Sequence, residues 1–270
     1  MNNTISNIAK ELEKLSVTQT TYGLRDNGLT GIVLLFFFYA RFLGKEKYEK
    51  FAKNLLEKAL SNILNYKNSQ FHPLLSDLGR TVSLLANEKF FEIEDSEFTK
   101  YFEEPLMLYL RNNHSFDFGF NTGITGICDF LLDKATEQEA LDITLGHIYS
   151  GLRVKGYPKH PVESLLLFPS EILRDLKIFL IKLEKANIPV PQKNLLKQAI
   201  RRFESKKVLN SNCPEYYILQ DLREAVIMDD QLKIQSLLEI IASSSSDLVF
   251  KGLASMSLED NSLPAWWKLV

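Results

Sequence analysis

A run of apolar residues introduced by three glycines limits what this chain can fold into. Residues Gly23 to Leu43 read GLRDNGLTGIVLLFFFYARFL, and the nine residues from Ile32 to Ala40 are all apolar. A helix that is apolar on every side has to be buried on every side. Since a bilayer span takes about 20 such residues, we predict an interior helix of a globular protein. The glycines would let its start approach another backbone segment closely.

Two later segments repeat this arrangement. Residues Phe71 to Asn87, FHPLLSDLGRTVSLLAN, keep a glycine with an apolar run behind it. Residues Asp117 to Leu132 read DFGFNTGITGICDFLL, in which NTGITGI repeats the earlier NGLTGI with one residue inserted. The recurring glycines, Gly28, Gly79 and Gly126, lie roughly 50 residues apart, a period that indicates a repeat architecture in which each unit needs its neighbours.

One-sided helices are predicted between the apolar ones. The segment from Lys45 to Leu64 has a helical apolar period with lysines and glutamates on its other face. Ser96 to Arg111 is similar, with Pro105 as a predicted kink. Thr136 and Glu139 have capping-box spacing and open a helix that we expect Gly151 to end. The residues predicted to face inward are Tyr48, Phe51, Leu55, Leu56, Ala59 and Ile63 in the first, and Phe98, Phe102, Leu106 and Tyr109 in the second.

Helical patterns continue to both ends of the chain. The first residues form an amphipathic pattern with Ile5, Ile8, Leu12 and Leu15 on one face. The later segments are 162–184, interrupted by Pro169, then 191–203, and a pair at 215–228 and 232–241 that a serine run stops. The last segment contains GLASM, which is similar to GLTGI. No segment has a clear strand period, so the fold class is all-α.

The alternation of buried and one-sided helices predicts an α/α toroid, a ring of helical hairpins. Six buried and six one-sided patterns are present, so we expect about six hairpins in one domain spanning residues 1–270. The glycines would lie near the axis of the ring, where the buried helices begin.

Composition and charge exclude several classes of partner. A net charge of −2 provides no electrostatic reason to expect nucleic acid or an anionic membrane. Two cysteines cannot build a disulfide framework, and the first residues lack an apolar signal segment. We therefore expect a cytoplasmic protein. The oligomeric state is not encoded in any pattern.

The glycine repeats resemble a known family. GLRDNGLTGIVLLFFFYARF and DFGFNTGITGICDFLLDK are similar to the Gly-Leu-x-x-Gly-x-x-Gly-Ile repeats of the lanthionine synthetase C-like family, and the similarity covers about half of the chain, best from Gly23 to Lys134. The end of the chain resembles the family's closing repeat, with Trp266 or Trp267 near its late tryptophan. The resemblance implies a toroid of seven helix pairs with an axial zinc ion that activates a peptide thiolate for thioether formation. Two cysteines and a histidine hold that zinc, two of them in a Cys-His-Gly motif.

This sequence departs from the family at the implied zinc site. Neither Cys128 nor Cys213 is followed by histidine, and Cys128 lies inside a predicted buried helix. By the resemblance, Cys213 corresponds to the first zinc cysteine. Phe250 and Lys251 would then replace the Cys-His pair, or the repeat that carries this pair is deleted. One thiolate without partners holds zinc poorly. We therefore expect no metal cofactor.

The remaining candidates lie near the predicted starts of the buried helices. Asp26, Asp77 and Asp117 could line one end of the ring as binding or acid–base groups, or could cap helices. Phe118 and Tyr157 would suit a peptide or sugar cleft there, or would belong to the core. His160, and with it His72, precedes a proline and could lie at the same mouth, whereas His147 is expected to be a satisfied, partly buried histidine.

Three functions remain open from the sequence. The first is a zinc-less, non-catalytic relative that binds a precursor peptide or a dehydratase in the maturation of a ribosomally synthesised, lanthipeptide-type peptide. The second is an active cyclase whose metal site has unfamiliar ligands, such as Cys213 with His160. The third is a carbohydrate-active toroid that uses Asp26 and Asp117, because six-hairpin toroids occur among such enzymes.

Overall fold

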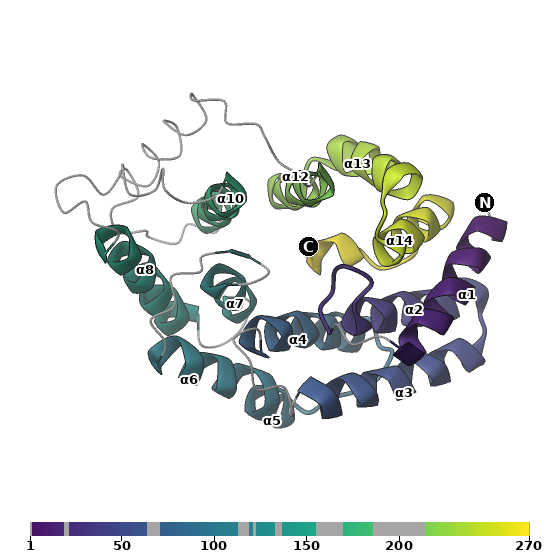
Figure 1. The fold of residues 1–270 in the computed structure, drawn as a ribbon, viewed down its shortest axis with the longest axis horizontal. Coiled ribbons are helices and arrows are strands. Elements are labelled where there is room, and N and C mark those ends of the chain that lie inside the picture. Colours follow the sequence, from purple (N-terminus) through teal and green to yellow (C-terminus); the bar gives the residue numbers. More distant parts are fainter. Residues whose placement is uncertain are drawn as a thin grey trace. The chain divides into compact units, whose positions relative to one another are not determined.

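The computed structural model describes residues 2–18, 22–63, 71–112, 119–120, 123–132, 137–154, 170–185 and 214–269. Within these ranges the chain is helical and contains no strand, which confirms the all-α class (Figure 1). Contacts divide it into two compact units. Unit 1 comprises Met1–Phe102 with Asp229–Val270, and unit 2 comprises Glu103–Met228.

The helices of unit 1 come from both parts of the chain that form it. They are α1 (Asn2–Thr18), α2 (Leu29–Leu43), α3 (Glu46–Ile63), α4 (Phe71–Asn87), α5 (Asp95–Phe98), α13 (Gln231–Ser244) and α14 (Leu248–Glu259), with a 3₁₀ turn, η2, at Trp266–Leu269. Unit 2 contains α6 (Glu104–Asn112), α7 (Ile124–Leu131), α8 (Glu137–Val154), α10 (Ser170–Lys185) and α12 (Pro214–Met228). A π-helical turn, η1 at Thr99–Glu103, joins α5 to α6.

Helix α2 is the centre of unit 1, as its apolar sequence predicts. Every residue from Leu29 to Ala40 is buried, and α1, α3, α4 and α14 all pack against α2. Consecutive helical residues point about 100° apart, so three successive phenylalanines need neighbours on several sides. Phe36 packs edge-on against Phe51 of α3, with ring centroids 4.7 Å apart, whereas Phe37 contacts Phe90 at 5.2 Å.

Helix α3 is the one-sided partner of α2. Its buried residues are Ala52, Leu55, Leu56, Ala59 and Ile63. Its other face carries two pairs spaced i,i+4, in which Lys50 lies 3.0 Å from Glu46 and Lys53 lies 2.7 Å from Glu49. Exposed pairs of this kind contribute about 0.3–0.5 kcal/mol each, so burial of the apolar face supplies most of the stabilisation.

Three details of the helices differ from the sequence prediction. In α1, Ile5, Ile8 and Leu12 are buried but Leu15 is 36% exposed, because the buried face continues through Ser16 instead. Helix α8 does not end at Gly151 but runs on to Val154. An interior glycine costs a helix only about 1 kcal/mol, which neighbouring turns can offset.

The third difference follows from Pro105. Proline cannot donate to the carbonyl four residues earlier, and its ring clashes with that carbonyl. The π turn η1 lies immediately before it and opens the backbone there. In α6, Leu106 and Leu110 are buried, whereas Tyr109 is only half-buried.

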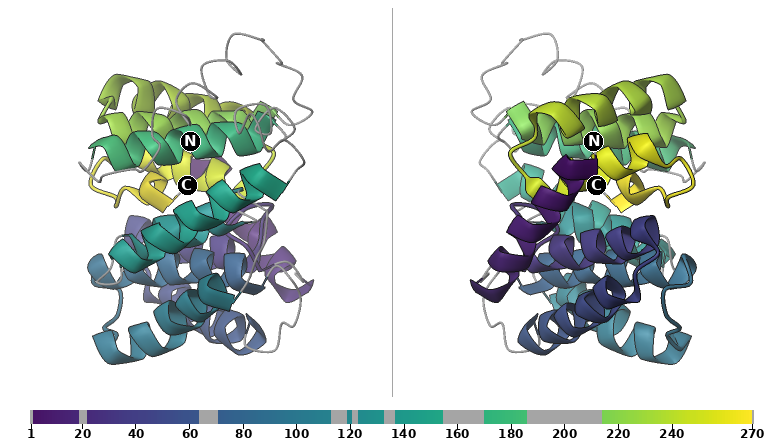
Figure 2. Two further views of the ribbon diagram at one scale, coloured as in Figure 1. Left: turned by 90° about the vertical axis from the view of Figure 1, so that its left-hand side faces the viewer. Right: turned by 90° about the vertical axis from the view of Figure 1, so that its right-hand side faces the viewer.

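The last segment of the chain is an integral part of unit 1. Helix α14 packs against α1, α2 and α13, and Figure 2 shows the α13–α14 pair at the yellow end of the colour scale. A Cβ atom at Gly252 would lie 2.6 Å from Leu35 Cδ1, so α14 approaches α2 closely. Trp266 is completely buried, stacks on Phe250 at 5.7 Å, and donates from Nε1 to Ser257 Oγ at 3.1 Å.

Helix α7 is the buried element of unit 2. All eight residues from Ile124 to Leu131 are buried, including Cys128, and α8 and α10 pack against it. Helix α12 in turn packs against α10. His147 of α8 is buried, with its Nε2 atom 2.8 Å from the carbonyl oxygen of Leu110, which agrees with the prediction of a satisfied histidine.

Loss of the buried tryptophan should destabilise unit 1 strongly. Substitution Trp266→Ala would leave a large cavity and remove the indole donor to Ser257 Oγ, whose hydroxyl still donates to the Leu253 carbonyl. We therefore expect a loss of about 3–5 kcal/mol in the free energy of unfolding, mostly from the cavity. The neighbouring Trp267 is half-buried, so Trp267→Ala serves as the matched control with a smaller loss. Urea denaturation followed by circular dichroism measures both. Equal losses would contradict the role assigned to Trp266.

Candidate functional site

The glycine-led turn of unit 1, residues Gly23–Gly28, is a tight backbone structure. Asp26 and Asn27 have φ values of 56° and 53°, and the Gly28 amide donates to the Arg25 carbonyl over 2.9 Å. Two successive left-handed residues closed by this bond form a type I′ turn, which aspartate and asparagine tolerate better than most residues. The turn reverses the chain directly before α2.

Two glycines are required by the way this turn folds onto the start of α2. A Cβ atom at Gly28 would overlap the carbonyl oxygen of Gly23 and lie 2.9 Å from that of Arg25. A Cβ atom at Gly31 would overlap the carbonyl oxygen of Leu24. Because backbone oxygens cannot move aside as flexible side chains can, both positions need glycine. The spacing of the glycines is thus a consequence of backbone packing.

Asp247, immediately before α14, binds the amides of this turn. Its carboxylate accepts from Asn27 N at 3.4 Å and also from the amide of Asp26. It caps α14 at the same time, accepting from Val249 N at 2.9 Å and Phe250 N at 3.3 Å. In return, Asn27 Oδ1 accepts from Leu248 N at 2.7 Å. Residues more than 200 positions apart in the sequence are therefore joined by reciprocal hydrogen bonds.

Asp77 lies on the other side of the same turn. It is 6% exposed and accepts a hydrogen bond from the backbone of Leu24. Its Oδ1 atom is 3.9 Å from Arg80 Nη1, and the positive charge of Arg25 also acts on it. Burial raises the pKa of Asp77 in spite of these favourable contacts. This carboxylate therefore has a structural position in the interior.

The positions of two aspartates do not fit the capping alternative. Asp77 lies inside α4 and caps no helix, and Asp26 is part of a turn. The residue before α2 is Gly28, which makes no side-chain cap. Among the described helices, those that an aspartate caps are α13, through Asp230, and α14, through Asp247. A glycosidase would need two carboxylates facing a sugar, and the buried, arginine-paired Asp77 is poorly suited to that chemistry.

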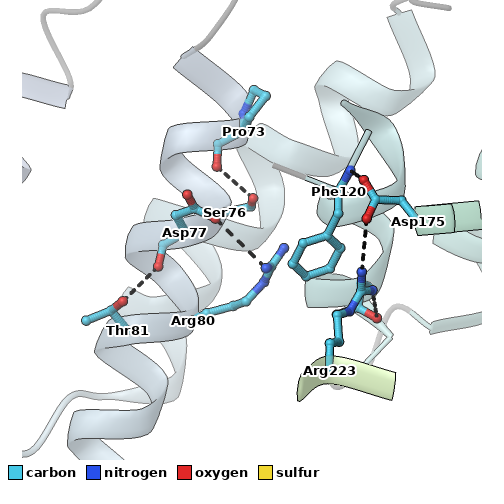
Figure 3. A network of polar contacts seen from close by, with 9 residues as sticks. Pro73, Ser76, Asp77, Arg80, Thr81, Phe120, Asp175 and Arg223 are labelled. Carbon is cyan, nitrogen blue, oxygen red and sulfur yellow. Dashed lines mark hydrogen bonds and ion pairs between the residues drawn. The ribbon is translucent and has the colours of Figure 1, made fainter. Parts of the chain in front are cut away.

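Unit 2 contains a second buried polar cluster, formed by α7, α10, α12 and the residue Phe120 before α7. Asp175 Oδ2 accepts from Phe120 N at 2.9 Å, and its Oδ1 accepts from Gln220 Nε2 at 2.9 Å. Arg223 Nη1 lies 3.9 Å from Asp175 Oδ1, and its guanidinium carbon is 3.3 Å from the centroid of the Phe120 ring (Figure 3).

A second aspartate extends this cluster toward the surface of unit 2. Asp129 Oδ1 is 3.4 Å from Arg223 Nη2 and 3.0 Å from Lys182 Nζ. The cluster thus has two carboxylates and two cations, so its formal charges balance. Desolvating a buried ion pair is costly, and removing one partner destabilises the fold further because the other charge is left buried without compensation. We therefore regard this cluster as a structural element of unit 2.

Burial keeps two candidate nucleophile or base residues uncharged at neutral pH. The Cys128 thiol is buried, and burial raises its pKa to about 12, so it carries no thiolate at neutral pH. Burial lowers the pKa of His72 to about 4, which keeps its imidazole neutral. The His72 ring lies edge-on against Phe71, with centroids 4.8 Å apart.

The other predicted site residues fall elsewhere. Asp117, Phe118, Tyr157, His160 and Cys213 lie outside the described residues. Among the residues that the structure describes, no three histidine, cysteine or acidic side chains are grouped so that they could hold a metal ion. In the same ranges, no helix combines the length and apolar character needed to cross a membrane.

Sequence reasoning missed the residues that complete both clusters. These are Arg25, Arg80, Asp129, Asp175, Gln220, Arg223 and Asp247. A signal was available for some of them, because the dipeptide Asp-Leu recurs at Asp77, Asp175, Asp221 and Asp247. In both clusters the carboxylates order backbone turns, and arginine or lysine side chains compensate their buried charge.

Alanine at Gly28 should disrupt the turn. Since the clash of Gly28→Ala is with backbone oxygens, we expect the free energy of unfolding to fall by about 3 kcal/mol or more. Gly146→Ala is the matched control, because nothing lies within 4 Å of a Cβ there. In the exposed interior of α8 that change should stabilise by about 0.5–1 kcal/mol. Thermal denaturation of both variants tests the difference, and a stable Gly28→Ala protein would refute it.

The raised pKa of Asp247 gives its contribution to stability a definite sign. Burial raises this pKa, so between pH 3.8 and the raised value the native state binds more protons than the unfolded state. The free energy of unfolding of the wild type minus that of Asp247→Asn should therefore fall as the pH rises from 4 toward 7. Asparagine keeps an oxygen that can cap α14, so this variant should fold.

Asp260 provides a control of opposite sign for that measurement. Hydrogen bonds from Ser262 lower the pKa of Asp260, so the stability of the wild type relative to Asp260→Asn should rise with pH. Urea titrations at a series of pH values measure both differences. Two differences with the same slope would contradict the environments described for these carboxylates.

No family model, no curated protein and no solved structure matches the chain.

Proposed function

We propose that this chain is a lanthionine synthetase C-like protein without the zinc site, acting in the maturation of a ribosomally synthesised, lanthipeptide-type peptide. In this role it binds the precursor peptide or a modifying enzyme such as a dehydratase, in the cytoplasm, and does not itself close thioether rings. The proposal includes an α/α toroid of about six hairpins.

The observation that carries the proposal is the geometry of the glycine-led turn. The resemblance rests on the pattern GLRDNGLTGI, and the glycines at positions 28 and 31 in that pattern are those at which a Cβ atom would overlap backbone oxygen. A pattern with such a physical requirement is better support than a chance match of small residues. The helix pairs α2–α3, α7–α8 and α14–α13, each combining a buried helix with a more exposed one, also fit a ring of hairpins.

The absence of zinc rests on the sequence. Zinc bound by two cysteines and a histidine would lower the pKa of a peptide cysteine, whose sulfur then adds to the β-carbon of a dehydroamino acid. This chain has no Cys-His pair. Of its two cysteines, Cys128 is a buried core thiol. An active cyclase would have to assemble a site from Cys213, His160 or other unfamiliar ligands.

The test is a binding and cyclisation assay on a dehydrated precursor peptide that contains cysteines, taken from the genes beside the one for this chain. We expect binding of the labelled peptide, or of the dehydratase, detected by fluorescence anisotropy. Mass spectrometry after thiol alkylation should show every peptide cysteine still free, with and without a chelator. Zinc content of the purified protein should be well below one ion per chain.

Two results would overturn the proposal in different ways. Stoichiometric zinc that is lost in Cys213→Ala, together with chelator-sensitive ring formation, would establish the active cyclase instead. Failure to bind either the peptide or the dehydratase would remove the peptide-maturation role altogether. The carbohydrate alternative would then be tested by glycan hydrolysis with Asp26→Asn and Asp117→Asn, which should abolish activity if these carboxylates are catalytic.

A further inference from the structure

We propose that Asp77 and Asp175 are equivalent positioning residues, each of which fastens the start of a glycine-led repeat to the buried part of another helix. Each carboxylate accepts a hydrogen bond from the backbone amide that directly follows the first glycine of a repeat. This assignment does not depend on the proposed function, because it concerns how the repeats are held.

The unit 1 instance joins α4 to the turn before α2. The first glycine is Gly23, and the backbone amide of Leu24 donates to the carboxylate of Asp77. Asp77 Oδ2 would lie 3.9 Å from a Cβ atom at Gly23, so the carboxylate is directly against the turn. Arg80, which is 8% exposed, lies 3.9 Å from Asp77 Oδ1 and compensates its charge.

The unit 2 instance joins α10 to the residues before α7. The first glycine is Gly119, and Phe120 N donates to Asp175 Oδ2 over 2.9 Å. The Gly119 carbonyl also accepts from Gly123 N at 3.1 Å, so the chain folds back here just before the helix begins. Arg223, which is 5% exposed, lies 3.9 Å from Asp175 Oδ1.

The two instances agree in sequence as well as in geometry. Gly23-Leu24 corresponds to Gly119-Phe120, and in each unit the acceptor is the aspartate of an Asp-Leu dipeptide inside a later helix, Asp77-Leu78 or Asp175-Leu176. Each aspartate has a buried arginine at the same distance, although Arg80 comes from the same helix as its aspartate and Arg223 comes from α12 (Figure 3). The repeated part is therefore the aspartate and its amide.

A negatively charged acceptor makes this bond stronger than a neutral one, and burial excludes water that could replace it. The arginines offset part of the cost of burying these carboxylates. Fixing one amide after the first glycine restricts the turn at the point where glycine leaves the backbone most free. The aspartates thus offset the flexibility that the glycines introduce.

Hydrogen exchange of single amides in the full-length protein tests the assignment. In Asp175→Asn the exchange rate of the Phe120 amide should increase about 10-fold relative to that of Ile127 in α7, because the charge-assisted bond is lost. In Asp77→Asn the exchange rate of the Leu24 amide should likewise increase relative to that of the Leu34 amide in α2. Nuclear magnetic resonance of labelled protein resolves these amides.

Matched controls separate this local effect from loss of stability. Asp221 also precedes a leucine, but its carboxylate pairs with Arg174, so Asp221→Asn should leave the Phe120 ratio unchanged. Asp95→Asn, at an exposed site, should leave the Leu24 ratio unchanged. The ratios compared are the exchange rate of Phe120 over that of Ile127, and that of Leu24 over that of Leu34. If these ratios stay unchanged in Asp175→Asn and Asp77→Asn, the proposal is overturned. The same holds if the control variants raise the ratios equally.

Discussion

Unit 1 depends on a backbone-to-backbone contact at the start of α2. The carbonyl oxygens of Gly23 and Leu24 occupy the space that side chains at Gly28 and Gly31 would need. This contact holds the turn against the helix, and the turn in turn presents the amides of Asp26 and Asn27 to Asp247. Larger residues at either glycine would therefore affect α14 as well as α2, although α14 is distant in the sequence.

Buried charge is the second constraint, and it accompanies the turns in both units. Asp77, Asp247 and Asp175 each accept backbone amides that precede or begin a buried helix. A carboxylate in such a position orders several backbone groups at once, whereas an apolar residue would leave those amides unsatisfied. The cost of burial appears in the raised pKa values of Asp77 and Asp247.

The sequence predicted those features that follow from local pattern. The burial of α2 and α7 follows from uninterrupted apolar residues, and the bounds of α4 match the predicted segment Phe71–Asn87. The roles of Asp26 and Asp77 were not predictable in this way, because proximity to a glycine in the sequence does not say which helix will lie against the turn. Likewise the buried Ser16 in place of Leu15 depends on the helices around α1 and not on its own period.

Unit 1 is built from two distant segments of the chain, and this affects how it folds. Asn27 bonds to Leu248 and Gly31 lies against Val249, so the first buried helix is completed only by residues near position 250. Contacts between residues so far apart must overcome a large loop-closure entropy before they stabilise anything, which makes their formation slow. During synthesis from the N-terminus, α2 would expose apolar surface until α14 arrives. Asp247 joins the two segments, because its carboxylate accepts from Asn27 N of the turn and from Val249 N at the start of α14.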